Sequence, residues 1–233
     1  MRGVKKSGKD KIMKSSAWHN KTVREPFAIL PLNEFIEKSA RLYGGNIAFS
    51  KRTGTVWNKY TYEQFLSGVK RVAGFLKMKG LAKGDKAGIL ADNCPEWMIA
   101  FMAIQWIGCI AVPLDTRSRQ FEHKHIITHA GLKALFANSR YLKMVEEEKQ
   151  EDNGCFMALN LLIAVDTSTR YPNLPDIIKN YDDNTPKEHL DISNTAIILY
   201  TSGTTGNQKG VMLSHENIVS NIDSLYRMIF FDE

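Results

Sequence analysis

The chain has 233 residues, 43% of them hydrophobic, which is enough for one large domain with a buried core. Its net charge of +6 comes from residues 1–24, where eight Lys or Arg face one acidic residue, so the rest of the chain sums to about −1. The rest of the sequence has no basic stripes with interleaved aromatic residues, and we therefore expect no nucleic-acid partner.

Residues 1–25 form a basic tail that we expect to be disordered and solvated. Met1–Lys14 has no apolar h-region, so we do not expect a secretory signal there, although its charges could touch an anionic membrane surface. The three cysteines, Cys94, Cys109 and Cys155, show no CxxC spacing. A reducing, cytoplasmic location is therefore favoured. Peripheral contact with a membrane through the basic tail is compatible with this location.

The first elements follow from apolar spacing and from turn residues. Residues 32–43 have the 3.6-residue period of an amphipathic helix, with Asn33 as a candidate cap and Gly44 as its end. Two β-favouring segments, 47–52 and 55–60, flank Thr53-Gly54 and predict a hairpin. Next, Thr61-Tyr-Glu-Gln64 is a capping box that opens a second helix, closed by glycines near residue 80 and followed by a strand over 86–91.

The segment Trp97–Leu114 has the minimum length and apolar character of a membrane span. However, Pro95 suits the first turn of a helix, and Gly108 interrupts the apolar run. We therefore predict a helix from Pro95 to about Ile107, followed by a buried strand over residues 109–112.

Ser118 is predicted to cap a helix that runs to about His129 and stops at Gly131. On this helix, His125 and His129 lie one turn apart, a spacing that could clamp a transition metal. No Cys or carboxylate nearby completes a closed site, so we predict an ordinary exposed face and no metal.

The remaining elements continue the alternation of strands with helices. Strands are predicted at 133–137 and 161–166, helices at 139–148 and from Pro175, and a polar surface connection at 180–194. This alternation is typical of an α/β fold in which helices cover mixed or parallel sheets.

Residues Thr201–Gly210 contain three glycines, four hydroxyl side chains and one lysine between two apolar segments, 195–200 and 211–213. An ordinary surface turn and a polyphosphate cradle both fit this composition. Glycine lets successive N–H groups turn towards one anion, while hydroxyls and a lysine add donors and positive charge. A Walker A loop is excluded, because Lys209 is followed by Gly210.

The segment Tyr200–Val211 resembles the signature of the adenylate-forming superfamily, roughly [YF]-[ST]-S-G-[ST]-T-G-x-P-K-G-V. Its one departure is Gln208, where the pattern usually has proline, and this substitution should leave the end of the loop less rigid. Asn93-Cys-Pro-Glu-Trp97 and Val112-Pro-Leu114 also match family motifs in the same order. The resemblance extends from about residue 30 onward.

The resemblance implies a fold: the N-terminal part of the large domain of an acyl-CoA-synthetase-like protein. Residues 26–233 would be a partial AMP-binding domain, without the small C-terminal domain, and the isolated fragment is expected to be inactive. The resemblance also implies which residues bind the ATP phosphates, namely Thr201, Ser202, Gly203, Thr204, Thr205, Gly206 and Lys209. Lys209 would help to stabilise phosphate charge, and His215 would either cap a helix or lie near the acyl site.

The implied activity is ATP-dependent conversion of a carboxylic acid to an acyl-adenylate and then to a thioester. ATP, Mg²⁺ and coenzyme A, or the pantetheine of an acyl-carrier protein, would be required. A medium- or long-chain fatty acid is the favoured substrate, and the oligomeric state stays open. The alternatives are an aryl-CoA ligase, a peptide-synthetase adenylation domain, or a non-catalytic nucleotide-binding module.

Overall fold

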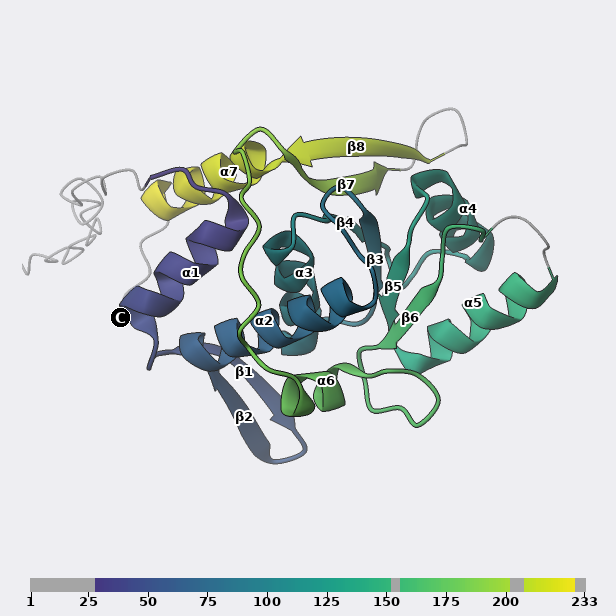
Figure 1. Ribbon diagram of the computed structural model, residues 1–233, viewed down its shortest axis with the longest axis horizontal. Coiled ribbons are helices and arrows are strands. Elements are labelled where there is room, and N and C mark those ends of the chain that lie inside the picture. Colours follow the sequence, from purple (N-terminus) through teal and green to yellow (C-terminus); the bar gives the residue numbers. More distant parts are fainter. Residues whose placement is uncertain (1–27, 152–155, 202–207, 229–233) are drawn as a thin grey trace, which may run out of the picture.

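The structure is a computed structural model that describes residues 28–151, 156–201 and 208–228, shown as coloured ribbon in Figure 1. It contains a six-stranded sheet in the order β6-β5-β3-β4-β7-β8. The strands are β3 (Lys86–Leu90), β4 (Ile110–Pro113), β5 (Ala134–Ala137), β6 (Leu161–Ala164), β7 (Thr195–Thr201) and β8 (Lys209–Ser214). All neighbouring strands are parallel except β7 and β8, which are antiparallel. The expected α/β architecture with a mixed sheet is therefore confirmed.

Helices cover both faces of this sheet, as Figure 1 shows. They are α1 (Leu32–Tyr43), α2 (Tyr62–Met78), α3 (Pro95–Trp106), α4 (Gln120–Ala130), α5 (Ser139–Glu151), α6 (Leu174–Asn180) and α7 (His215–Met228). A separate hairpin of β1 (Ile47–Thr53) and β2 (Val56–Thr61) projects beside α2. The sequence anticipated this hairpin and the capping box of α2, in which Thr61 and Gln64 exchange hydrogen bonds.

Alternation along the central strands creates two apolar cores, one on each face of the sheet. On β3, Ala87 and Ile89 join the core built by α1, α2 and α3, whereas Leu90 joins the core built by α4 and α5. Successive strand residues point to opposite faces, so a strand with helices on both sides must be apolar throughout. This explains why the strand segments appear in the sequence as continuous apolar runs.

The apolar segment Trp97–Leu114 divides into α3 and β4, as predicted. Gly108 lies between them at φ +70°, a conformation that glycine adopts at low cost. Helix α3 is buried around most of its circumference, because it packs between α2, α1 and the sheet. Within the described residues, every helix is too short or too polar to cross a bilayer.

Two predicted caps are wrong. The N-cap of α1 is Pro31, and Asn33 lies one residue inside the helix, buried, with its Nδ2 donating to the Glu188 carbonyl over 2.8 Å. The N-cap of α4 is Arg119, because Glu122 accepts from the Arg119 backbone N–H over 2.7 Å and thereby fixes the start of the helix. A tertiary contact in the first case and a bond from the Arg119 backbone N–H to the Glu122 carboxylate in the second outweighed the local preference of Asn and Ser.

The polar connection over 181–194 does not simply cross the surface. Its Thr185 carbonyl accepts from the Trp106 indole N–H over 2.9 Å, and its Asp183 accepts from the Ser67 hydroxyl over 2.9 Å. Leu190 is buried against the body of the protein. These contacts attach the segment to α2 and α3 and lead it into β7.

Candidate active site

Strands β7 and β8 frame the predicted phosphate loop. They form an antiparallel pair in which Thr201 lies opposite Lys209 and Tyr200 lies opposite Gly210. Both Thr201 and Lys209 are exposed, at the two ends of the loop. The other predicted phosphate ligands, Ser202, Gly203, Thr204, Thr205 and Gly206, lie outside the described residues.

The loop begins at the carboxyl edge of the sheet, beside the point where the strand order reverses. The chain runs from β3 to its neighbour β4, and then returns through α4 to β5 on the other side of β3. In open α/β sheets, ligands bind in the crevice outside the carboxyl ends of the strands at such a switch point. A cavity of about 310 Å³ lies here, lined by Ala91, Asn93, Trp97, Pro113, Leu114, Asp115, Thr116, Leu199 and Tyr200.

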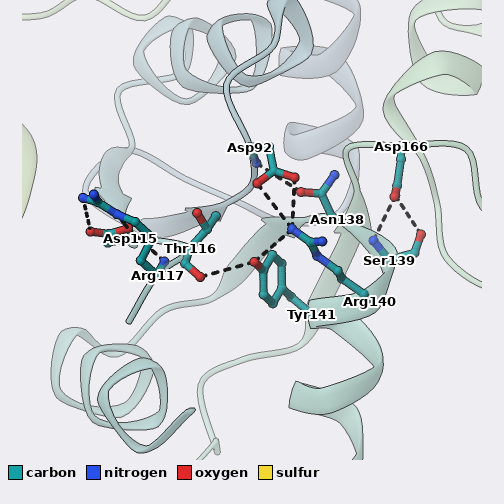
Figure 2. A network of polar contacts seen from close by, with 9 residues as sticks. All are labelled: Asp92, Asp115, Thr116, Arg117, Asn138, Ser139, Arg140, Tyr141 and Asp166. Carbon is teal, nitrogen blue, oxygen red and sulfur yellow. Dashed lines mark hydrogen bonds and ion pairs between the residues drawn. The ribbon is translucent and has the colours of Figure 1, made fainter. Parts of the chain in front are cut away.

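Polar contacts connect the segments that follow four neighbouring parallel strands, namely three loops and the first turn of α5, as Figure 2 shows. Arg140, after β5, forms an ion pair with Asp92, after β3, over 3.1 Å. The Tyr141 hydroxyl donates to the Thr116 carbonyl, after β4, over 3.3 Å. The Ser139 backbone N–H donates to Asp166, after β6, over 2.9 Å. This network holds together the edge of the sheet at which the cavity opens.

Tyr200 connects the start of the loop to α4. Its hydroxyl lies 2.7 Å from the Nδ1 of His129, and its ring contacts His125 and His129 edge-on. The two histidines stack on each other with ring centroids 5.4 Å apart. Burial raises the pKa of the Tyr200 phenol, so this group stays protonated at neutral pH. Gly210 leaves room for the ring, because a Cβ at that position would lie 3.2 Å from the Tyr200 Cζ.

Gln208 connects the end of the loop to the same helix. Its Nε2 donates to the Glu122 Oε1 over 3.1 Å, and its carbonyl lies 3.3 Å from the His125 Nε2. A carbonyl oxygen only accepts, so the His125 Nε2 must carry the proton in this contact. The residue that departs from the motif is therefore held by both its side chain and its backbone.

His215 begins α7 and is buried, with 1% of its surface exposed. Its Nδ1 accepts from the Leu32 backbone N–H over 3.2 Å, which connects α7 to the first residue of α1. The capping contacts of α7 come from Ser214 and Asn217, each of which accepts from the other's backbone N–H. Burial lowers the pKa of His215 to about 4, so it is neutral at physiological pH.

The described residues contain no group of three or more His, Cys, Asp or Glu side chains that could hold a metal ion. His125 and His129, whose spacing suggested a metal clamp, instead contact the two ends of the loop. Cys109 is buried, and burial raises the pKa of its thiol to about 12, consistent with the predicted core position.

The sequence alone did not assign a role to the residues around the cavity. Asn93, Trp97 and Leu114 stood out as parts of two motifs, and the structure brings them together with Tyr200 around one cavity. The available signal was position, because Asn93 and Leu114 lie within three residues after the ends of β3 and β4, and Tyr200 lies near the end of β7. Which strands would be neighbours could not be read from the order of the elements.

Comparisons with known proteins agree with this arrangement. The sequence profile of the family described as AMP-binding enzyme matches residues 36–232. A crotonobetaine/carnitine–CoA ligase from Escherichia coli is 30% identical over 195 residues, which are 80% of this chain and 37% of the relative. The chain thus spans little more than a third of the length of the curated relatives it matches.

Solved structures show the same fold. The fatty acyl CoA synthetase of Mycobacterium tuberculosis superposes with a TM-score of 0.70 at 22% identity, covering 80% of this chain and 35% of that one. The luciferase-like enzyme of the mealworm Zophobas morio superposes with a TM-score of 0.74 at 21% identity, covering 87% and 47% respectively.

Proposed function

The chain belongs to the AMP-binding enzyme family, and from this premise we propose that the protein activates a carboxylic acid with ATP. The acid becomes an acyl-adenylate and is then transferred to a thiol, either coenzyme A or an acyl-carrier pantetheine. The observation that carries the proposal is the motif Tyr200–Val211 between β7 and β8, next to the cavity at the switch point. The E. coli relative named above is itself a CoA ligase, which supports the assignment.

Within this reaction, the loop would bind the β- and γ-phosphates of ATP. We propose that the backbone N–H groups of residues 201–206 and the hydroxyls of Ser202, Thr204 and Thr205 are donors to phosphate oxygens. Lys209, exposed at the start of β8, would place its ammonium group against the pyrophosphate as negative charge builds on it. Donors that meet charge developing in the transition state lower the barrier, whereas uniform binding does not.

ATP in such a reaction arrives as its Mg²⁺ complex. We assign no ligand of Mg²⁺ to the described residues, which offer no suitable cluster of side chains. In our proposal, backbone N–H groups, hydroxyls and the Lys209 ammonium group therefore bind the phosphates.

For the acid, we propose a fatty acid of medium or long chain. A fatty acyl CoA synthetase is among the structures that share the fold, which supports this choice at the level of fold alone. The E. coli relative is named for crotonobetaine and carnitine, so carnitine and short acids belong in the test as competitors.

The decisive measurement is carboxylate-dependent exchange of labelled pyrophosphate into ATP by the full-length protein, since the fragment alone is expected to be inactive. Acids of graded length, from acetate to palmitate, are compared with aryl acids, amino acids and carnitine. Exchange that depends on a fatty acid is the expected result. Exchange only with aryl or amino acids would replace the substrate, and no exchange with any acid would overturn the ligase proposal.

A further inference from the structure

Helix α4 contacts the phosphate loop at both of its ends. At the end of β7, the Tyr200 hydroxyl lies 2.7 Å from His129 Nδ1. Just before β8, Gln208 donates to Glu122 through its side chain and accepts from His125 through its carbonyl. These residues occupy positions 122, 125 and 129, which lie on one face of the helix because their spacings are three and four.

Glu122 is a fixed acceptor. Its second carboxylate oxygen, Oε2, accepts from the Arg119 backbone N–H over 2.7 Å at the N-terminus of α4. The carboxylate is therefore held in one orientation before Gln208 meets it. A hydrogen bond to a charged group is stronger than one between neutral groups, and less entropy is lost when the acceptor is already immobile.

The contact between Gln208 and Glu122 matters because of where Gln208 lies. The strand ladder ends at the pair Thr201 and Lys209, so Gln208 is the residue directly beyond the ladder on the β8 side. Proline, which the motif usually has here, restricts the backbone through its fixed φ. Glutamine has no such restriction, and its side-chain bond to Glu122 supplies a connection to α4 that proline cannot make, beside the backbone-carbonyl contact to His125.

We propose that α4 braces both ends of the loop through Glu122, His125 and His129, and that Gln208 is a positioning residue for phosphate binding. The brace itself rests on the contacts above. The effect of the brace on ATP binding rests on the proposed function. The experiment therefore measures the brace and ATP binding separately.

The first measurement is hydrogen–deuterium exchange of the full chain, read on peptides that contain residues 199–201 and 209–211. Gln208→Ala removes the side-chain bond and should speed exchange of these amides roughly tenfold, the effect of one charge-assisted hydrogen bond. Gln208→Glu places two carboxylates face to face and should speed exchange further.

The double variant Glu122→Gln with Gln208→Glu reverses the direction of the bond. The amide at 122 keeps an oxygen for the Arg119 N–H and donates its N–H to the new carboxylate. Exchange should return to within about twofold of the wild type. The matched control is Gln120→Ala, which removes an amide–carboxylate bond from α4 to Glu148 on α5 and should leave the loop peptides unchanged.

The second measurement is the KM for Mg·ATP in pyrophosphate exchange by the full-length protein, wild type and with the same substitutions. A positioning role predicts that Gln208→Ala raises this KM roughly tenfold, and that the double swap restores it while Gln120→Ala does not change it. A change confined to thermal stability would indicate a purely structural contact and would contradict the positioning role.

Equal exchange in Gln208→Ala and wild type, or failure of the double swap to rescue Gln208→Glu, would overturn the brace. If the wild type shows no pyrophosphate exchange with any acid, the proposed function fails, and the deuterium-exchange comparison still decides the brace by itself.

Discussion

At the scale of single residues, His215 shows how burial alone changes chemistry. It is almost completely enclosed, and its one hydrogen bond joins α7 to α1 by accepting the Leu32 N–H. Charging the ring would place an unpaired cation inside the protein and would remove the acceptor that Leu32 needs. The ring is therefore kept neutral by burial, with a pKa of about 4 against its ordinary 6.5.

This shift predicts a specific loss of stability in acid. Between pH 6.5 and 4 the unfolded chain binds a proton at His215 and the folded chain does not, so stability falls as the pH falls through this window. We expect the His215→Gln variant, whose side chain keeps an acceptor but does not titrate, to lose less stability as the pH falls. Urea denaturation at pH 7 and pH 5 should show wild type losing about 2 kcal/mol more of its unfolding free energy than the variant. Equal losses in the two proteins would contradict a neutral, buried His215.

Lys209 is the complementary case, an exposed side chain whose proposed role lies in the reaction and not in the fold. We predict that Lys209→Ala slows pyrophosphate exchange by on the order of 100-fold, because one preorganised charge is removed from the transition state. Stability should change by less than about 0.5 kcal/mol, as is usual for an exposed residue.

The control for Lys209→Ala is Lys59→Ala, which removes another exposed strand lysine on the separate hairpin. This variant should retain the wild-type rate. A Lys209→Ala enzyme with an unchanged rate would remove Lys209 from the phosphate site.

At the scale of elements, the central strand β3 depends on a glycine for its packing. A Cβ at Gly88 would lie 2.5 Å from Leu132 Cδ1 and 2.9 Å from Leu135 Cδ1, both in the core between the sheet and α4. Strand β3 can thus lie this close to Leu132 and Leu135 only because position 88 has no side chain. Because β3 ends at the cavity, its packing also sets the position of Asp92 and Asn93.

We predict that Gly88→Ala destabilises the protein by about 1–3 kcal/mol through overpacking. Gly45→Ala is the control, because a Cβ there would meet nothing within 4 Å and the backbone is not in the left-handed region. The midpoint of urea denaturation should fall for the first variant and not for the second, with unchanged m values. Equal midpoints would mean that the two leucines move aside freely.

At the scale of the whole molecule, the sheet has an open edge at β8. This strand is last in the sheet order, and among the described residues it exposes Val211 by 45% and Met212 by 63%. The following helix α7 exposes Leu225 and Met228 as well. An apolar edge strand with unpaired backbone groups is a template for association with another chain.

We therefore expect the chain as given to associate in a concentration-dependent manner, and Met212→Lys to reduce that association. Met78→Lys is the matched control, because Met78 is exposed by 60% at the end of α2, away from the sheet edge. Sedimentation velocity over a range of concentrations measures the association of both variants. An equal reduction by both variants would point to general solubility and not to the β8 edge.

The family, the order of the elements and the place of the motif Tyr200–Val211 between two strands could be predicted from the sequence. They depend on local information: the motif Tyr200–Val211, the apolar periodicity of α1 and α2, and the glycine that separates α3 from β4. Each is written into a short segment of chain and needs no partner to be recognised. The phosphate ligands Ser202–Gly206 remain predictions, since they lie outside the described residues.

Only the tertiary structure decided what each polar side chain contacts. Asn33 and Ser118 have good local capping propensity, yet a distant carbonyl engages the first, and the bond from the Arg119 backbone N–H to Glu122 starts the helix after the second. The same is true where the loop between β7 and β8 ends: Gln208 departs from the motif in the sequence, and only the packing of α4 against these two strands gives it Glu122 and His125 as partners. The physical reason is that local patterns determine secondary structure through the backbone, whereas hydrogen bonds between residues more than 80 positions apart depend on which faces the sheet brings together.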